Sequence, residues 1–274
     1  MSSTAEAIIP ICNQARVVLL SPTATKPSLT QSGQYFFRLW PSDNYDGKVV
    51  AEAAYKKLRY RTVSILYVNV AYGAGITEVF EREFGKLNGK IVSKDGYAQG
   101  ATDFRAVLIK LQGLNPDAIF VPGYVAEVTQ ILKQARELGI KAKFLGVNSL
   151  YDPKLIEIAG VAAEGAVFTY PTFDTKSQNP VISRFVAAYK AEYGTEPDAF
   201  AAQGYDSFCV MRQAIAKVFG SSGPIDGVTI RGDLLSMGPY SGPGGNFTFL
   251  ENGDVEKPLR LLTVKNGQFV ELGH

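Results

Sequence analysis

The sequence predicts an α/β protein built around mainly parallel sheets. From Arg16 to about Pro171, short runs rich in β-branched residues alternate with amphipathic stretches of helical period, which is the signature of βαβ units. The chain has 274 residues, of which 46% are hydrophobic, and it contains no apolar run near the roughly 20 residues of a membrane span. These observations favour a folded globular chain without membrane insertion.

Short apolar runs bounded by turn residues predict the strands. Val, Leu, Ile and Phe dominate them, as expected for the strands of a mainly parallel sheet. In chain order the runs are VVLL (17–20), TVSILYV (62–68), KIVSK (90–94), DAIFV (117–121), KFLGV (143–147) and GAVFT (165–169).

The stretches between these runs predict helices. In EVTQILKQARELG, apolar residues recur every three or four positions from Val128 to Leu138, and Gly139 supplies a left-handed stop. Asp152 followed by Pro153 is typical of a helix start, so KLIEIAG is expected to be helical.

After Pro171 the alternation ends. Two consecutive helices are expected over about 179–194 and 200–220, followed by turn-rich sequence. Asn-Gly pairs in ENGD and KNGQ predict hairpins, whereas SGPGGN (241–246) is expected to be a loop or a crossover.

Charge and residue usage exclude several classes of function. Lys plus Arg number 28 against 26 Asp plus Glu, and this balance of +2 lacks the basic stripe of a nucleic-acid binder. Cys12 and Cys209 are far apart and form no disulfide framework or CxxC metal site. The only histidine is His274, so a Ser-His-Asp or Cys-His mechanism would need the last residue as its base.

Polar side chains follow the predicted strands, where ligands bind in open parallel sheets. The set consists of Ser21, Thr23, Thr25, Asn69, Tyr72, Gly123, Tyr124, Asn148, Ser149 and Tyr151. Hydroxyls, amides and phenols suit the binding of a small polar molecule by hydrogen bonds, with rings against its apolar part. They do not suit bond breaking, so we expect no catalytic residue, metal or cofactor.

One motif offers an alternative. YGAGITE (72–78) follows a strand and partly matches the dinucleotide-binding pattern, with Glu78 where the third glycine belongs and Asp95 downstream. Because an anionic side chain near a helix N-terminus disfavours a pyrophosphate, an NAD-dependent enzyme is the weaker interpretation.

Nearly the whole chain resembles the leucine/isoleucine/valine-binding type of extracellular solute-binding protein, the type I periplasmic binding protein family. The segments that carry the resemblance include LLSPTATKPSLT, FRLWPSDNYDGK, AYGAGITEVFEREF, PDAIFVPGY, ILKQARELGIKAKFLG, AAEGAVFTYP, FVAAYKAEYGTEPDAFAAQGYDS and FLENGDVEKP.

The resemblance implies the type I periplasmic-binding-protein fold, with two Rossmann-like lobes that have parallel-rich sheets. The first lobe is expected to comprise 1–42 plus 173–248, and the second 43–172 plus 249–274. The family's signal peptide and first strands, about a hundred residues, are expected to precede Met1, so the first lobe is expected to be incomplete.

The resemblance also implies ligand-binding residues. In this family an amino acid or similar carboxylate lies between the lobes. The carboxylate cradle would include Ser21, with Thr23 and Thr25 giving a backbone group and a hydroxyl to the ligand, and Ser3 or Ser2, in a preceding loop, gripping the carboxylate. Tyr72 and Tyr124 match aromatic residues of the second lobe, and Phe200 matches one near the side-chain pocket.

One position departs from the family. Asn148 stands where an acidic residue usually meets the ligand's ammonium group. Either another carboxylate serves, for which Asp206 is a candidate, or the ligand has no α-ammonium group.

The resemblance further implies partners and a location. The ligand would be delivered to the permease of an ABC transporter from the periplasm or the extracellular space. This chain has no basic-then-apolar signal peptide at Met1, which favours a cytosolic ligand sensor or regulator on the same fold as the alternative.

Overall fold

The computed structural model describes residues 1–171, 173–220 and 224–273. The chain divides into two compact units: unit 1 is Met1–Ser42 with Pro171–Pro258, and unit 2 is Asp43–Tyr170 with Leu259–His274. The third boundary lies at Pro258, whereas the sequence places it at 248. The segment between these points stays in unit 1 because Phe249 and Val255 form an antiparallel bridge and belong to that unit's core.

Unit 2 is built on a seven-stranded sheet of order β11-β10-β7-β6-β5-β3-β4. The strands from β3 to β7 pair in parallel, and β10 pairs with β11 in antiparallel fashion. Their bounds are β3 (Thr62–Val68), β4 (Lys90–Tyr97), β5 (Ala118–Phe120), β6 (Lys143–Gly146), β7 (Val167–Pro171), β10 (Leu259–Lys265) and β11 (Gln268–Glu271). The predicted α/β class with a mostly parallel sheet is confirmed.

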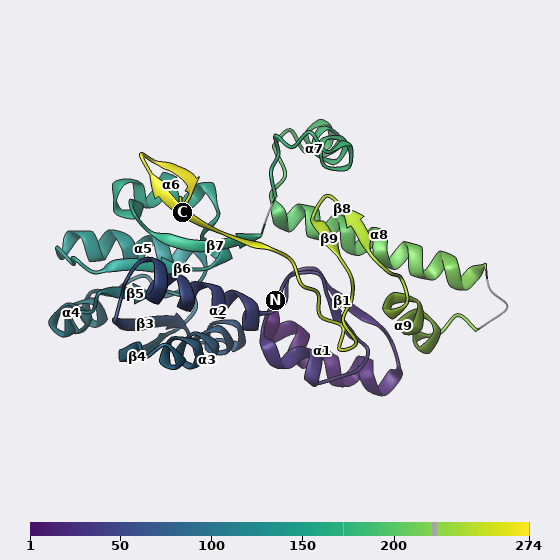
Figure 1. The fold of residues 1–274 in the computed structure, drawn as a ribbon, viewed down its shortest axis with the longest axis horizontal. Helices are drawn as coiled ribbons and strands as arrows, with labels where there is room; N and C mark the ends of the chain where they lie inside the picture. Colours follow the sequence, from purple (N-terminus) through teal and green to yellow (C-terminus); the bar gives the residue numbers. More distant parts are fainter. Residues whose placement is uncertain (172, 221–223, 274) are drawn as a thin grey trace. The chain divides into compact units, whose positions relative to one another are not determined.

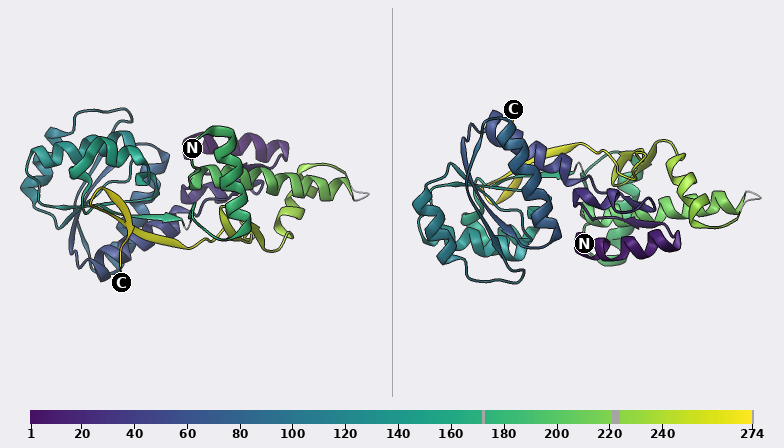
Figure 2. Two further views of the ribbon diagram at one scale, coloured as in Figure 1. Left: turned by 90° about the horizontal axis from the view of Figure 1, so that it is seen from above. Right: turned by 90° about the horizontal axis from the view of Figure 1, so that it is seen from below.

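Helices cover both faces of this sheet, as Figures 1 and 2 show. One layer packs α2 on α3, and the other packs α5 against α4 and α6. The helices are α2 (Asp43–Glu52), α3 (Ala71–Lys86), α4 (Arg105–Leu114), α5 (Val125–Glu137) and α6 (Pro153–Ala159), and π-helix η2 (Ala53–Lys57) continues α2. Asp152 caps α6 by accepting the Lys154 N–H at 2.8 Å, as the sequence predicts.

The core of unit 2 explains why its central strands, such as β3 and β5, are mainly apolar runs. Val63, Ile65 and Phe120 are fully buried, because both faces of a parallel sheet are covered by helices. Phe80 of α3 stacks on Phe120 with ring centroids 4.3 Å apart. The rigid platform formed in this way fixes the loops at the carboxyl ends of the strands.

The strands described in unit 1 are short. Strand β1 pairs with β2 in parallel fashion, with Leu19 opposite Phe36 and Leu20 opposite Phe37. Strand β8 pairs with β9 in antiparallel fashion. The elements are α1 (Ser2–Ala15), β1 (Leu19–Ser21), β2 (Phe36–Arg38), α7 (Pro180–Tyr193), α8 (Ala199–Phe219), α9 (Gly227–Leu235), β8 (Tyr240–Gly242) and β9 (Gly245–Phe247). Figure 1 shows α1 in purple and α8 in green.

Two small cores hold unit 1 together. One gathers Phe37, Leu39 and Val210 with Phe247 and Phe249. The other packs Ile9 of α1 against Leu29 and Phe36. The exposed rings of Tyr193, Phe208 and Phe219 lie outside both cores, on α7 and α8.

The turns test the hairpin predictions. Asn266 and Gly267 both have positive φ, 53° and 68°, and join β10 to β11, so the KNGQ prediction is confirmed. The expectation of a loop or crossover at SGPGGN is wrong: Pro243 and Gly244 form the tip of the β8–β9 hairpin. The pairing of Tyr240 with Phe247, whose rings lie 5.2 Å apart, stabilises it.

No helix in the described part of the chain is long and apolar enough to serve as a membrane span.

Candidate functional site

Two tyrosines meet at the point of unit 2 where the sheet topology favours a ligand. The chain leaves β3 for β4 on one side, and β5 lies on the other side of β3, so the carboxyl ends of β3 and β5 flank a switch point. Tyr72 lies in the first turn of α3 after β3, and Tyr124 is the N-cap of α5 after β5. Their rings stack at 5.5 Å with an interplanar angle of 26°.

A chain of hydrogen bonds fixes Tyr72. Its hydroxyl donates to Ser149 Oγ at 3.3 Å, and the Ser149 hydroxyl donates to the Gly123 carbonyl at 2.5 Å. Burial raises the pKa of Tyr72 well above its usual value, and the charges of Asp43 and Asp46 raise it further. Tyr72 is therefore a neutral phenol held in one orientation.

Asn148 contacts a buried carboxylate. Its Nδ2 donates to Asp46 Oδ2 at 2.7 Å, and the Thr169 hydroxyl donates to the other oxygen, Asp46 Oδ1. Burial raises the pKa of Asp46 to about 6, although both hydrogen bonds act to lower it. Asn148, the side chain expected to contact a ligand, is therefore held in place by a carboxylate of α2.

A second acid begins the same helix. Asp43 is fully buried in the first turn of α2, where the helix dipole favours a negative charge. Its charge contributes to the raised pKa values of both Tyr72 and Tyr124, so it lies near the tyrosine pair. Neither acid was predicted from the sequence as a site residue. The signal for them in the sequence is a pair of aspartates three positions apart in SDNYD, and this pattern is equally typical of a solvated helix start.

In unit 1 the structure corrects the loop expected at Ser2 and Ser3, because both residues lie in the first turn of α1. Ser3 is exposed. Ser2 is buried, and its Oγ accepts the backbone N–H groups of Thr25 and Lys26, each at 3.2 Å. Ser2 therefore ties the start of α1 to the segment after β1.

The residues after β1 form a tight turn. Ser21 Oγ accepts the N–H of Thr23 at 3.4 Å and that of Ala24 at 3.1 Å. Thr25 is buried and gives its N–H to Ser2. Since the lone pairs of Ser2 Oγ and Ser21 Oγ both receive two N–H donors, each hydroxyl retains its O–H as a donor.

A buried arginine supports this turn from β2. Arg38 Nη1 donates to the Lys26 carbonyl at 2.8 Å and to the Ala24 carbonyl at 3.4 Å, and its Nε pairs with Asp254. The guanidinium is fully buried. Arg38 is not predictable from the sequence, because its partner Asp254 is 216 positions away and nothing local marks it as internal.

The remaining two candidates lie on α8. Phe200 stacks on Trp40 with ring centroids 4.4 Å apart and an interplanar angle of 11°. Asp206 accepts the Gly244 N–H at 2.8 Å and the Tyr240 hydroxyl at 3.2 Å, which binds it to the β8–β9 hairpin.

Lys257 completes the polar cluster around this hairpin. Its Nζ donates to Gln203 Oε1 at 2.7 Å and to the Gly244 carbonyl at 3.1 Å. Burial raises the pKa of Asp206, and the Gly244 N–H and the Lys257 charge oppose that rise. This arrangement gives Asp206 a packing role within unit 1.

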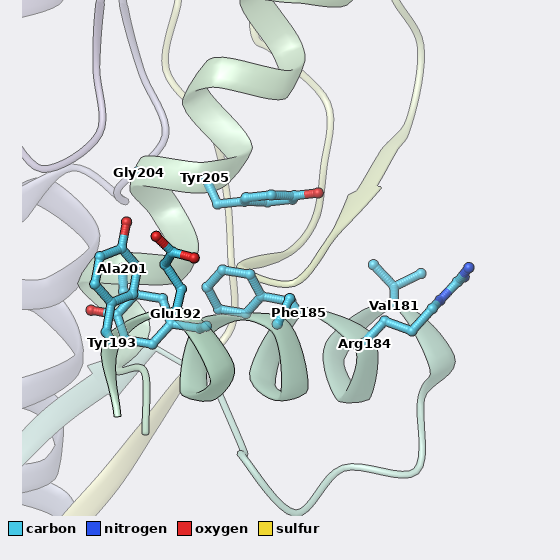
Figure 3. Close-up of a pocket in the computed structure, with 10 residues that line it drawn as sticks. Val181, Arg184, Phe185, Glu192, Tyr193, Ala201, Gly204 and Tyr205 are labelled. Atoms are coloured by element: carbon cyan, nitrogen blue, oxygen red, sulfur yellow. The ribbon is translucent and has the colours of Figure 1, made fainter. Parts of the chain in front are cut away.

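A separate groove of about 770 Å³ lies between α7 and α8 (Figure 3). Phe185 and Tyr205 face one another in it at 5.1 Å. The residues that line it are Val181, Arg184, Phe185, Ala188, Tyr189, Glu192, Tyr193, Ala201, Gly204 and Tyr205. None of the candidate ligand residues is among these lining residues.

The glycines of YGAGITE lie inside α3 and not in a loop before it. A Cβ at Gly73 would approach the Val68 carbonyl oxygen to 2.0 Å, so this glycine allows the helix to start close against β3. The geometry therefore accounts for the motif without a nucleotide. Among the described residues, no group of three or more His, Cys, Asp or Glu side chains could hold a metal ion.

A family model described as periplasmic binding protein matches residues 1–268. The leucine-specific-binding protein of Salmonella typhimurium is 33% identical over 192 residues, which cover 70% of this chain and 52% of that protein. The leucine-, isoleucine-, valine-, threonine- and alanine-binding protein of Pseudomonas aeruginosa is 27% identical over 256 residues, covering 93% of this chain and 67% of that protein.

Solved structures match as well. The leucine binding protein LivK from Thermotoga maritima has a TM-score of 0.89 and 33% identity, and the match covers 98% of this chain and 76% of that one. The branched-chain amino acid binding protein LivJ from Streptococcus pneumoniae, in complex with isoleucine, has a TM-score of 0.82 and 29% identity, with the same coverage. The chain spans about half the length of the leucine-specific relatives.

Proposed function

Because this chain belongs to the periplasmic binding protein family, we propose that it binds a small amino acid or related carboxylate, of the branched-chain type, for an ABC transporter. The relatives named for leucine and for leucine, isoleucine, valine, threonine and alanine support this ligand class. A periplasmic or extracellular site of action and a permease partner are part of the same proposal.

The observation that carries the proposal is a pair of donor hydroxyls: Ser21 ends β1, and Ser2 at the start of α1 binds the segment that follows β1. Ser2 and Ser21 each accept two backbone N–H groups, so their O–H groups can only donate further. Donor hydroxyls in a fixed turn suit an acceptor-only partner, and a carboxylate is such a partner. We therefore propose that Ser2, Ser21, Thr23 and Thr25 receive the ligand carboxylate.

Unit 2 offers groups for the rest of an amino acid. The stacked rings of Tyr72 and Tyr124 supply an apolar surface, and Asn148 adds a polar group beside them on the next strand end. We propose that these three residues contact the ligand together with Phe200, which Trp40 holds in place by stacking.

Titration calorimetry on the full chain tests the proposal with leucine, isoleucine, valine and benzoate. Micromolar binding of an aliphatic amino acid, about −8.2 kcal/mol, is the expected result. Tyr124→Ala should weaken it by about 1–3 kcal/mol, the scale of burying one large side chain. Tyr193→Ala, which removes an exposed ring from α7, is the matched control. Failure of all amino acids to bind would reject the proposal.

Transport is tested separately. Membrane vesicles that contain the cognate permease and ATPase should take up the bound amino acid only when this protein is added. Uptake that does not depend on the protein would remove the transport role and leave amino acid binding intact.

A further inference from the structure

We propose that Asp46 supplies the negative charge that selects ligands with an ammonium group, and that Asn148 transmits it to the ligand. This inference rests on the proposed amino acid binding and names one determinant of its specificity. Asp46 acts in it as a positioning residue behind Asn148.

A carboxylate lies directly behind Asn148. The family resemblance puts an acidic residue at position 148, where this chain has Asn148. The structure places a carboxylate one hydrogen bond behind that position, since Asn148 Nδ2 lies 2.7 Å from Asp46 Oδ2. The charge is therefore displaced into α2 and not lost from this part of unit 2.

The same hydrogen bond fixes the orientation of the Asn148 amide. An ionised carboxylate only accepts hydrogen bonds, so the NH₂ group of Asn148 must face Asp46. Thr169 donates to the other carboxylate oxygen and holds it from β7. The carbonyl Oδ1 of Asn148 is then the amide atom turned away from Asp46, and a carbonyl oxygen accepts hydrogen bonds from an ammonium group.

The side chains around Asp46 are neutral or negatively charged. The groups that face it are Asn148 after β6, Thr169 on β7 and Tyr72 on α3, and all three are uncharged at neutral pH. Asp43, in the same helix turn, adds negative charge near Tyr72. A buried carboxylate whose donors among the described residues are neutral is costly, and a cationic ligand group nearby would offset that cost.

Comparison of leucine with 4-methylpentanoate tests the inference, because the two share a carbon skeleton and carboxylate and differ in the ammonium group. Asp46→Asn is expected to weaken leucine binding about tenfold relative to 4-methylpentanoate, because the variant loses the negative charge that attracts the ammonium group. Glu52→Gln, at the exposed end of α2, should leave both affinities unchanged.

The charge-swapped variant Asp46→Asn with Asn148→Asp keeps one carboxylate and reverses the hydrogen bond. It should restore leucine binding to within a few fold of the parent, which a purely structural role of Asp46 would not achieve. Thermal unfolding of each variant establishes that it is folded.

Acid gives a further readout. Leucine affinity should fall between pH 7 and pH 5 in the parent as Asp46 takes up a proton, whereas the carboxylate and ammonium groups of leucine change little in that interval. Asp46→Asn should show no such fall.

The outcomes separate the two proposals. If no amino acid binds the parent, the proposed function is wrong. If leucine binds the parent but Asp46→Asn binds it equally well, or the parent prefers the deaminated acid, only this inference is overturned.

Discussion

The two units each bury a carboxylate on a helix, and they treat it differently. Asp206 of unit 1 accepts hydrogen bonds from Gly244 and Tyr240 and lies near the Lys257 ammonium group. In the described part of unit 2, the side chains that donate to Asp46 are Asn148 and Thr169, and neither carries a charge. The charge of Asp206 is therefore partly offset by a lysine of its own unit, while the charge of Asp46 meets only the neutral donors just named.

This difference separates a structural acid from a candidate binding acid. Burial raises the pKa of both carboxyl groups, so the direction of the pKa shift does not distinguish them. The partners do. A carboxylate near a cation of the protein is already partly neutralised, whereas a carboxylate held by neutral groups can be neutralised by a cationic ligand.

Loss of the internal cation should have the largest effect on stability. Lys257→Met leaves Asp206 buried without its positive neighbour and removes donors from Gln203 and Gly244, so we expect a loss of about 3 kcal/mol in the free energy of unfolding. Urea denaturation measures it.

Two controls sharpen this prediction. Lys190→Met removes an exposed lysine of α7 and should cost less than about 1 kcal/mol. The double variant Lys257→Met with Asp206→Asn should recover part of the loss, because both charges are then absent. Equal losses in the single and double variants would contradict a compensated pair.

Asp46 should oppose folding at neutral pH. Its folded pKa of about 6 lies above the unfolded value of 3.8, so the folded state binds the proton more tightly. The free energy of unfolding should fall as the pH rises from about 4 to 6, by about 3 kcal/mol in total from this group.

Asp46→Asn removes that dependence and should be the more stable protein at pH 8. Urea denaturation of parent and variant at pH 4.5 and pH 8 gives the difference between them at each pH. A difference that does not change with pH would show that Asp46 ionises in the fold as it does in the unfolded chain.

Ser2→Ala should have a moderate effect in unit 1. It removes the acceptor of two backbone N–H groups, those of Thr25 and Lys26, and the expected cost is about 1–2 kcal/mol in unfolding free energy. Ser3→Ala is the matched control on the next residue, which is exposed and should tolerate the change. Equal effects of the two variants would remove the special role of Ser2.

Tyr72→Phe in unit 2 should have the smallest effect. The ring and its stacking on Tyr124 stay, and only the hydrogen bond to Ser149 is lost. Because Ser149 still donates to Gly123, we expect a change below about 1 kcal/mol in unfolding free energy, measured by thermal denaturation. A larger loss would mean that the hydroxyl supports the loops more strongly than its 3.3 Å contact indicates.

The sequence predicts features that depend on local chemistry. Asn266 and Gly267 adopt positive φ, which few other residues tolerate, so the KNGQ hairpin is predictable from two letters. Asp152 before Pro153 is equally local. The strands of unit 2 are predictable because burial on both faces requires continuous apolar runs.

The sequence fails where distant residues decide. Asp46 is buried because partners 102 and 123 positions away donate to it, and no local pattern marks that. Pro243 and Gly244 suit a loop as well as a hairpin, and contacts with distant residues such as Asp206 and Lys257 help to fix the choice. The tyrosine pair was predicted as two separate residues, while its stacking follows from the sheet topology.

The close start of α3 on β3 has a consequence for mutational tolerance. Any side chain at Gly73 would meet the Val68 carbonyl oxygen, which is backbone and cannot turn aside. A compensating substitution at Val68 would not help, because every residue has that oxygen. In a saturation library, position 73 should therefore accept glycine alone, while Gly85 in the same helix, with open space around it, should accept most residues.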